Sequence, residues 1–558
     1  MIELSVRRRI GTLLLFLGPI TTFAVSPFYN FDPINLVKLL FVTSFAFAFL
    51  ALLISGGFHR PFRSERLLLT ASAGFVIWML VALFASDAPI NQQIWGVFGR
   101  STGILTYTSL VIVLIATALV FDVRFYRKLV DALVLTSVPM TGYALVQIAG
   151  RDPISWSQMA PFATLGNINF SSAFFGLAAL CAVTLGVDRE NSLLLRGALF
   201  LLAVVQMLIV LETGSIQGFM IFIAGLGVGV FVWIRTAPKL RNLQLPYLAL
   251  GVVGTGFVVA ALFNMGPLAR FVFQDTILFR FDYWYAGWMM TLRNPILGLG
   301  MDSYGDWYRE LRGEVATLRT GPDRITNTAH NIYLDISASG GFPLLIFYMV
   351  IIGLALGAAI RVIRRQTEFN PYFTAMFSAW VAYLIQAGVS INQVGVGIWG
   401  WLFTGALIGY EKASRQEPSK KPEKPVSRQS HVQLPASAAL LGIFGFGFGF
   451  TLAFIPLNAD AKFRTSLQSG VARDQFVAAQ ALGSAAYHME LSLDSAIKAG
   501  DETLTGEITD ELLKRYPRDF MAWRVRQVLT TSTPERRKEA SQRLRELDPF
   551  NTTTVPVP

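Results

Sequence analysis

Residues 34–55 read INLVKLLFVTSFAFAFLALLIS, a stretch in which Lys38 is the one ionisable side chain. A helix that crosses the hydrocarbon core of a bilayer needs about 20 predominantly apolar residues. This stretch therefore predicts a membrane-spanning helix. Comparable apolar runs recur along most of the chain, so the sequence predicts an all-α polytopic membrane protein rather than a soluble globular one.

The composition supports this fold class. Of the 558 residues 53% are hydrophobic and 15% are charged, whereas soluble domains carry about 25% charged residues. So much apolar surface excludes a disordered chain and a set of ordinary soluble domains. The chain has a single cysteine, Cys181, which excludes an intrachain disulfide.

We predict about thirteen transmembrane helices from the apolar runs. They lie at residues 10–28, 34–55, 68–86, 103–121, 127–149, 169–186, 193–212, 216–235, 246–263, 341–361, 371–390, 394–410 and 435–456. The first run follows Arg7, Arg8 and Arg9 and so begins like a signal peptide. Because no small-residue cleavage site follows it, we expect this helix to be retained.

Lysine and arginine in the predicted loops give the orientation. Loops on the side of the N-terminus carry 23 of these residues, and the short loops on the other side carry two, Arg100 and Arg151. The excess marks the cytoplasmic side, so we expect a cytoplasmic N-terminus and an extracytoplasmic C-terminus. The net charge of +11 then reflects membrane orientation and not a nucleic-acid partner.

The predicted spans divide the chain into four parts. A membrane domain at residues 1–410 includes a large outer loop at 264–330. The Lys-, Pro- and Ser-rich segment 411–433 is expected to be a disordered cytoplasmic linker. The last transmembrane helix follows at 434–456, and residues 457–558 form an extracytoplasmic helical tail.

The tail carries repeated helical patterns. A long amphipathic stretch at residues 472–500 and the segments 511–517, 519–529 and 534–551 are predicted to be helical, and Thr533-Pro534 is a typical helix start. The pattern is similar to tetratricopeptide repeats, with a small helical cap as the alternative. Such a tail could bind a protein partner.

Four polar motifs fall on the predicted outer face. They are GRSTG at residues 99–103, LGNIN at 165–169, RFDYW at 280–284 followed by NPILGLG at 294–300, and TAHNIYLD at 328–335 before Gly340-Gly341. The large outer loop has seven arginines, no lysine and seven acids. Arginine favours bidentate binding of phosphate or carboxylate, although ordinary pairing with the acids is an alternative.

Arg280 and His330 stand out among these residues. Arg280 begins a predicted helix, 280–293, whose stripe of Phe281, Trp284, Trp288 and Leu292 indicates a helix lying on the membrane surface. His330 is the one histidine of four at the outer membrane edge, where its ordinary pKa of about 6.5 suits general-base chemistry. A polar cap is the alternative for His330, and a plain aromatic belt is the alternative for the stripe.

Together, GRSTG, GNIN, RFDYW…NPILGLG and TAHNIYL…GG on a many-span scaffold resemble the O-antigen ligase and O-antigen polymerase superfamily over roughly residues 90–400. The resemblance implies a metal-independent, inverting glycosyltransferase without a cofactor. Such an enzyme moves a glycan from an undecaprenyl-diphosphate carrier to a lipid core, a growing polysaccharide or a protein. The reaction takes place at the outer face of the cytoplasmic membrane.

The resemblance also implies roles for individual residues. His330 would activate the acceptor and Arg280 would hold the diphosphate, as the two catalytic residues. The further binding candidates are Arg100, Gln217, Tyr283, Trp284, Asn167 and Asn331. Gln217, in TGSIQG, stands where the superfamily would have an arginine, which puts the reaction in question.

Three other readings remain open at this stage. A glycolipid transporter would carry ionisable residues within its spans, and few are present here. A metal-dependent glycosyltransferase would need paired carboxylates, whereas the short first outer loop has Asp32 alone. A non-catalytic scaffold of envelope glycan assembly would explain Gln217 and the tail.

Overall fold

A computed structural model describes residues 2–56, 63–154, 156, 161–273, 275–416 and 434–551. Within these ranges the regular elements are helices, α1 to α23 and the short 3-10 helix η1 (Arg241–Leu243), and no strand occurs. The all-α prediction is confirmed.

Each of the thirteen predicted spans overlaps one helix. These helices are α1 (Ile2–Phe23), α2 (Asn35–Ser55), α3 (Arg63–Ala85), α5 (Ile104–Ala118), α6 (Val123–Ile148), α7 (Ile168–Gly186), α8 (Leu193–Glu212), α9 (Gln217–Thr236), α10 (Gln244–Leu262), α15 (Ile332–Arg365), α16 (Pro371–Ala387), α17 (Val394–Gln416) and α18 (Ala436–Ser469). Among the described residues nine helices are long and apolar enough to cross a membrane. The chain is a multi-pass membrane protein, and the number thirteen stays a prediction.

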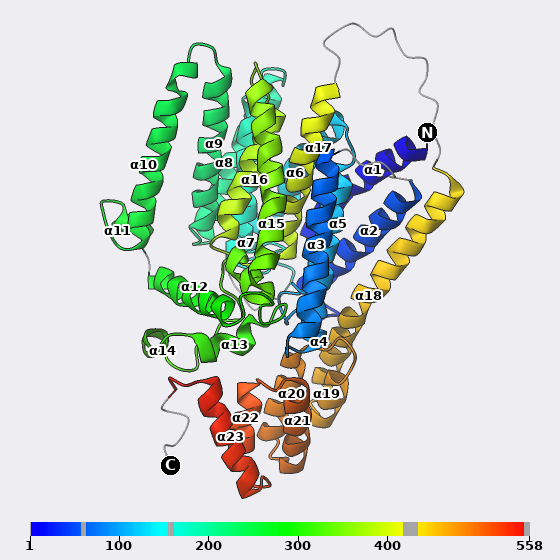
Figure 1. Ribbon diagram of the computed structural model, residues 1–558, viewed down its shortest axis with the longest axis vertical. Helices are drawn as coiled ribbons and strands as arrows, with labels where there is room; N and C mark the ends of the chain where they lie inside the picture. Colours follow the sequence, from blue (N-terminus) through cyan, green and yellow to red (C-terminus); the bar gives the residue numbers. More distant parts are fainter. Residues whose placement is uncertain are drawn as a thin grey trace.

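Figure 1 shows these helices as an upright bundle. The short connections with many basic residues lie at the upper end, and α12 (Asp275–Arg293) lies across the lower end. Below α12 come α13 (Tyr304–Leu311), α14 (Glu314–Thr320) and the helices of the tail. The predicted outer loop and the tail therefore share one end of the bundle.

The last span packs tightly on the second one because it is rich in glycine. A Cβ atom at Gly445 would lie 2.4 Å from the carbonyl oxygen of Phe47, and one at Gly449 would lie 2.5 Å from that of Thr43. Small residues spaced four apart let two membrane helices approach closely. The GFGFG pattern of α18 thus fixes its position along α2.

Helix α15 is broken at Gly340 and Gly341, where Gly341 has a φ of +69°. The freed backbone groups bond to the NPILGLG segment: the N–H of Phe342 donates to the carbonyl of Pro295 (2.8 Å), and the N–H of Leu299 donates to that of Ala338 (2.9 Å). The indole of Trp78 donates to the carbonyl of Gly340 (2.8 Å). The break and the segment therefore form one unit.

The tail begins as a direct extension of a membrane helix. Helix α18 continues to Ser469, so the predicted boundary at 457 falls inside it. The amphipathic stretch predicted at 472–500 forms two helices, and the chain turns between them at Gly483 (φ +85°), which lies against Pro456. The tail helices are α19 (Ala472–Ala479), α20 (Ala486–Lys498), α21 (Glu502–Arg515), α22 (Phe520–Val528) and α23 (Pro534–Leu547).

These helices pack one after another along the chain. Thr533 caps α23 by accepting a hydrogen bond from the N–H of Arg536, with Pro534 in the first turn, as predicted. The likeness to tetratricopeptide repeats stays a prediction. Helix α17 runs six residues into the predicted linker, and residues 417–433 of that linker lie outside the described residues.

Buried ion pairs fasten the tail to the outer loop. The carboxylate of Asp548, at the end of α23, accepts from Arg309 (3.0 Å) and from Arg312 (2.8 Å), and the Arg312 and Asp548 side chains are fully buried. Arg518 pairs with Glu310, and its guanidinium lies 3.5 Å from the centre of the Trp307 ring. Charged groups buried in this way require their partners.

We expect Asp548→Asn to lower the free energy of unfolding by about 3–5 kcal/mol, because it leaves the buried charge of Arg312 without its counter-charge. Denaturation of the full-length protein in nanodiscs, followed by tryptophan fluorescence, measures the change. Asp510→Asn is the matched control, since the half-exposed Asp510 pairs with Arg526 and Arg536 on the surface. Such pairs contribute about 0–1 kcal/mol, and equal effects of the two variants would contradict this account.

The predicted orientation can be tested with single cysteines. Cys181 is buried and should not react with a membrane-impermeant maleimide. In spheroplasts we expect the reagent to label Glu539→Cys in the tail, and to label Arg241→Cys, at the other end of the bundle, only after lysis. The reverse labelling pattern would overturn the orientation.

Candidate active site

Arg280 lies in the second turn of α12, because the helix begins at Asp275, five residues before the predicted start. Its guanidinium donates a hydrogen bond to the carbonyl of Val389, in the turn after α16. None of the described carboxylates pairs with it, whereas Arg293 pairs with Glu310. Arg280 thus keeps most of its donor groups available at the outer edge of the bundle.

The loop that carries His330 is shaped by its neighbours. Asp335, one turn into α15, accepts from the hydroxyl of Thr328 (2.5 Å) and from the N–H of Ala329 (2.8 Å). Asn331 caps α15 by accepting from the N–H groups of Tyr333 and Leu334. The side chain of Asn331 therefore has a structural role in this state.

His330 itself adopts a φ of +52°, a region that non-glycine residues rarely occupy. Its N–H donates to the hydroxyl of Thr328 (3.1 Å). A strained backbone position in a loop is a common feature of functional sites. Here the conformation turns the imidazole toward α12.

The imidazole of His330 lies beside Tyr283 of α12 and within electrostatic range of Arg280 on the same helix. Its ring lies 5.4 Å from the ring of Tyr283, centre to centre. Burial, together with the positive charges of Arg280 and Arg100, lowers the pKa of His330 to about 4. At neutral pH the imidazole is therefore uncharged and can accept a proton. The structure thus brings Arg280, Tyr283 and His330 together.

Arg100 is held close to this group by a buried ion pair. Its guanidinium lies 3.3 Å from the carboxylate of Asp302 and donates to the carbonyl of Asn327, three residues before His330. The same carboxylate accepts from the N–H of Val97 (2.8 Å). Arg100 therefore connects the GRSTG motif to the segment after NPILGLG, through Asp302, and to the segment before His330, through Asn327.

Asp302 is the residue that motif reasoning missed. Asp302 is the second residue after NPILGLG and is one of seven acids in the large outer loop. Its position in the sequence therefore did not distinguish it from the other six acids. The sequence signal that could have pointed to Asp302 was Arg100, one of the two basic residues in the short outer loops. A buried arginine at this position would need a carboxylate partner.

Trp284 faces away from the imidazole contact. Its ring lies edge-on to Phe281, which stacks on Phe263 at the end of α10. The Trp284 indole N–H is buried without a hydrogen-bond partner. Trp288 and Leu292, further along the stripe, are 44% and 47% exposed, as expected for a helix at a membrane surface.

Asn167 and Gln217 lie in a second group, around α7 and α9. Asn167 caps α7 by accepting from the N–H of Asn169, whose own side chain accepts from the hydroxyl of Ser215 (2.7 Å). Gln217 is the first residue of α9, and its buried side-chain carbonyl oxygen has no hydrogen-bond partner. The hydrogen bonds described for these side chains do not reach His330.

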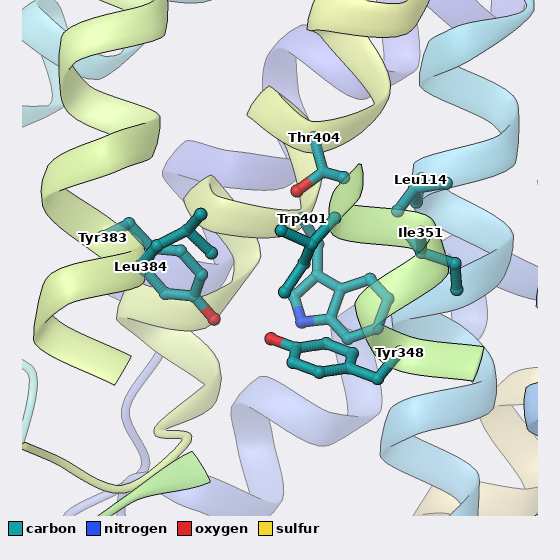
Figure 2. A pocket seen from close by; sticks show the side chains of 8 residues that line it. Leu114, Tyr348, Ile351, Tyr383, Leu384, Trp401 and Thr404 are labelled. Carbon is teal, nitrogen blue, oxygen red and sulfur yellow. The ribbon is translucent and has the colours of Figure 1, made fainter. Parts of the chain in front are cut away.

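A small cavity inside the bundle is separate from this chemistry. It measures about 10 Å³ and is lined by side chains from α5, α15, α16 and α17. Figure 2 shows the hydroxyls of Tyr348 and Tyr383 pointing toward each other beside Trp401. The space suffices for about one water molecule, so it is no substrate site.

Comparison with known protein families gives one match in this region. A family model described as O-antigen ligase matches residues 198–349. The match confirms the predicted resemblance to the O-antigen ligase and polymerase superfamily. It includes α12 and the His330 loop, while Arg100, Asn167 and the tail lie outside it. No curated protein matches the chain.

We expect Arg280→Gln to raise the pKa of His330 from about 4 toward its ordinary value, because the change removes one of the charges that disfavour the imidazolium. The measurement is an NMR titration of full-length protein labelled at the histidine ring carbons, with His330→Gln to assign the signal. Arg293→Gln, on the same helix but paired with Glu310, is the control. An unchanged pKa in Arg280→Gln would refute the electrostatic contact.

Proposed function

Because the chain is a multi-pass membrane protein with an O-antigen ligase domain at residues 198–349, we propose that it transfers a glycan from an undecaprenyl-diphosphate carrier to an acceptor. The reaction takes place at the outer face of the cytoplasmic membrane. The observation that carries the proposal is the placement of Arg280, which has no carboxylate partner among the described residues, beside the uncharged imidazole of His330.

Arg280 holds the diphosphate in this proposal. Breaking the bond between the anomeric carbon and the phosphate leaves a diphosphate with an additional negative charge. A fixed guanidinium stabilises this charge best where little water competes, and Arg280 is partly buried on α12, the helix that lies across the lower end of the bundle (Figure 1). Its planar group can make two parallel hydrogen bonds to phosphate oxygens.

His330 acts as the general base. The acceptor hydroxyl attacks the anomeric carbon from the side opposite the diphosphate, so the configuration at this carbon inverts. The proton of the hydroxyl passes to the imidazole. The Nδ1 atom lies 3.4 Å from the carbonyl of Thr328, a contact that favours Nδ1–H and leaves Nε2 as the acceptor. This chemistry requires no metal and no cofactor.

The other candidate residues have supporting roles. Arg100 positions the His330 loop through Asp302 and Asn327 and is not the diphosphate ligand. Tyr283, next to the imidazole, presents a ring on which a sugar can pack. Gln217 offers an uncharged hydrogen-bonding group in place of an arginine, so the main phosphate contact falls to Arg280.

We expect Arg280→Gln and His330→Ala each to reduce the rate of glycan transfer about 10²- to 10³-fold, which is typical of lost charge stabilisation or lost general-base catalysis. Arg280→Lys should retain part of the activity, since it keeps the charge but loses the bidentate geometry. Transfer is measured in proteoliposomes with carrier-linked glycan extracted from the host. The control is Arg293→Gln. Wild-type transfer rates in both Arg280→Gln and His330→Ala would disprove the proposal.

A further inference from the structure

A cavity of about 580 Å³ lies between the outer loops of the membrane domain and the tail. Its walls come from α4 (Ile90–Trp95) and α13 on one side and from α20 and α22 on the other, elements that face each other at the lower end of the bundle (Figure 1). Sites for small molecules measure about 300–1,000 Å³. The cavity is therefore large enough for a ligand of a few rings.

Three carboxyl groups from three helices line this cavity. Asp306 of α13 accepts from the amide of Gln92 (2.8 Å), and Glu490 of α20 is hydrogen-bonded to Asp519, which caps α22. Burial raises the pKa of Asp306 to about 7 and also raises those of Glu490 and Asp519. Near neutral pH these groups can both donate and accept hydrogen bonds.

An aromatic pair spans the two walls. Phe98 of the membrane domain and Tyr487 of the tail have ring centres 4.8 Å apart, and both line the cavity. Tyr487 is 39% exposed and presents its ring to the cavity, although most aromatic rings of the tail are buried. Rings combined with carboxyl groups suit sugars, which offer apolar C–H faces and hydroxyl edges.

The cavity does not suit an anionic ligand. Its two arginines are already paired, Arg309 with Asp548 and Arg518 with Glu310. A diphosphate would find no unpaired cation among these lining residues, and any carboxyl group that loses its proton would repel it. An uncharged saccharide therefore fits the lining better than the donor diphosphate does.

We propose that this cavity is a binding site for the uncharged sugars of the acceptor glycan. The cavity reaches Thr326 and Asn327, which lead along the chain to His330. An acceptor held there would approach the imidazole from the tail side, while the donor diphosphate lies at Arg280. This inference rests on the proposed function, which identifies the ligand as an acceptor glycan. It makes the tail part of the acceptor site.

Binding and transfer are tested separately with the full-length protein in nanodiscs. The binding probe is the oligosaccharide that mild acid releases from the host's own envelope glycolipid, the acceptor of the transfer assay, and calorimetry measures its Kd. The transfer assay uses envelope glycolipid of the same host as acceptor. The variants are Tyr487→Ala and Glu490→Gln, and thermal unfolding confirms that both are folded.

The controls are matched to these variants within the tail. Phe550→Ala removes a ring that is also 39% exposed but does not line the cavity. Glu539→Gln removes an exposed carboxylate on α23. We expect Tyr487→Ala and Glu490→Gln each to weaken oligosaccharide binding about tenfold and to raise the KM for the acceptor similarly. The KM for the donor should stay at the wild-type value in these variants. In both control variants, oligosaccharide binding and the KM for the acceptor should also stay at the wild-type values.

The outcomes separate the two proposals. Oligosaccharide binding that depends on Tyr487 and Glu490, without any transfer, would support the cavity site and overturn the proposed function. Transfer with unchanged acceptor KM and unchanged oligosaccharide binding in both variants would overturn the cavity site alone. A third outcome would overturn the sugar proposal and assign the cavity to a protein segment. In that outcome an unglycosylated peptide binds in competition with the oligosaccharides, and the oligosaccharides bind the wild-type protein no more tightly than they bind the two variants.

Discussion

The break in α15 is the constraint on which the outer face of the molecule depends. A helix interrupted at Gly340 and Gly341 releases backbone groups at the edge of the membrane, where a polar group without a partner costs several kcal/mol. The NPILGLG segment supplies these partners through the backbone of Pro295 and Leu299. Satisfying the break therefore brings the end of α12 against the start of α15. Because Arg280 and Tyr283 lie on α12 and His330 directly precedes α15, the same hydrogen bonds bring the candidate catalytic residues into one place.

Two buried carboxylates extend this arrangement outward. Asp302 follows the segment that pairs the break and holds Arg100, which in turn contacts the His330 loop at Asn327. Asp548 performs a similar task, because its pairs with Arg309 and Arg312 attach the tail. In both cases a buried arginine is stable only where a carboxylate comes from a different segment. The middle of the outer loop is consequently tied to the membrane domain through Asp302 and to the tail through Arg309 and Arg312.

The sequence predicted the parts of this structure that depend on composition and periodicity. Apolar runs located the helices, and the aromatic stripe located α12 to within five residues of its start. The pairing of Arg100 with Asp302 and the cavity beside Tyr487 could not be predicted, since each depends on which distant segments meet. The division of 472–500 into two helices was not predicted for the same reason: after α19 ends at Ala479, the chain turns at Gly483, which lies against Pro456, 27 positions earlier in the chain. The capping role of Asn331 is local, because the side chain bonds to the N–H groups of Tyr333 and Leu334.

In the proposed reaction, the electrostatics of the site would connect donor binding to acceptor activation. Burial and the charges of Arg280 and Arg100 lower the pKa of His330 to about 4, so the imidazole is uncharged but only weakly basic. A diphosphate bound at Arg280 would offset those positive charges, and the pKa of His330 would rise as a result. The base then gains strength when the leaving group is in place, and it is weak when the donor is absent. An arginine with a permanent carboxylate partner, such as Arg293 with Glu310, could not produce this coupling, because its charge is already balanced before the donor arrives. In this proposal Arg280 differs from Arg293, Arg309, Arg312 and Arg319 of the same loop, each of which pairs with a carboxylate.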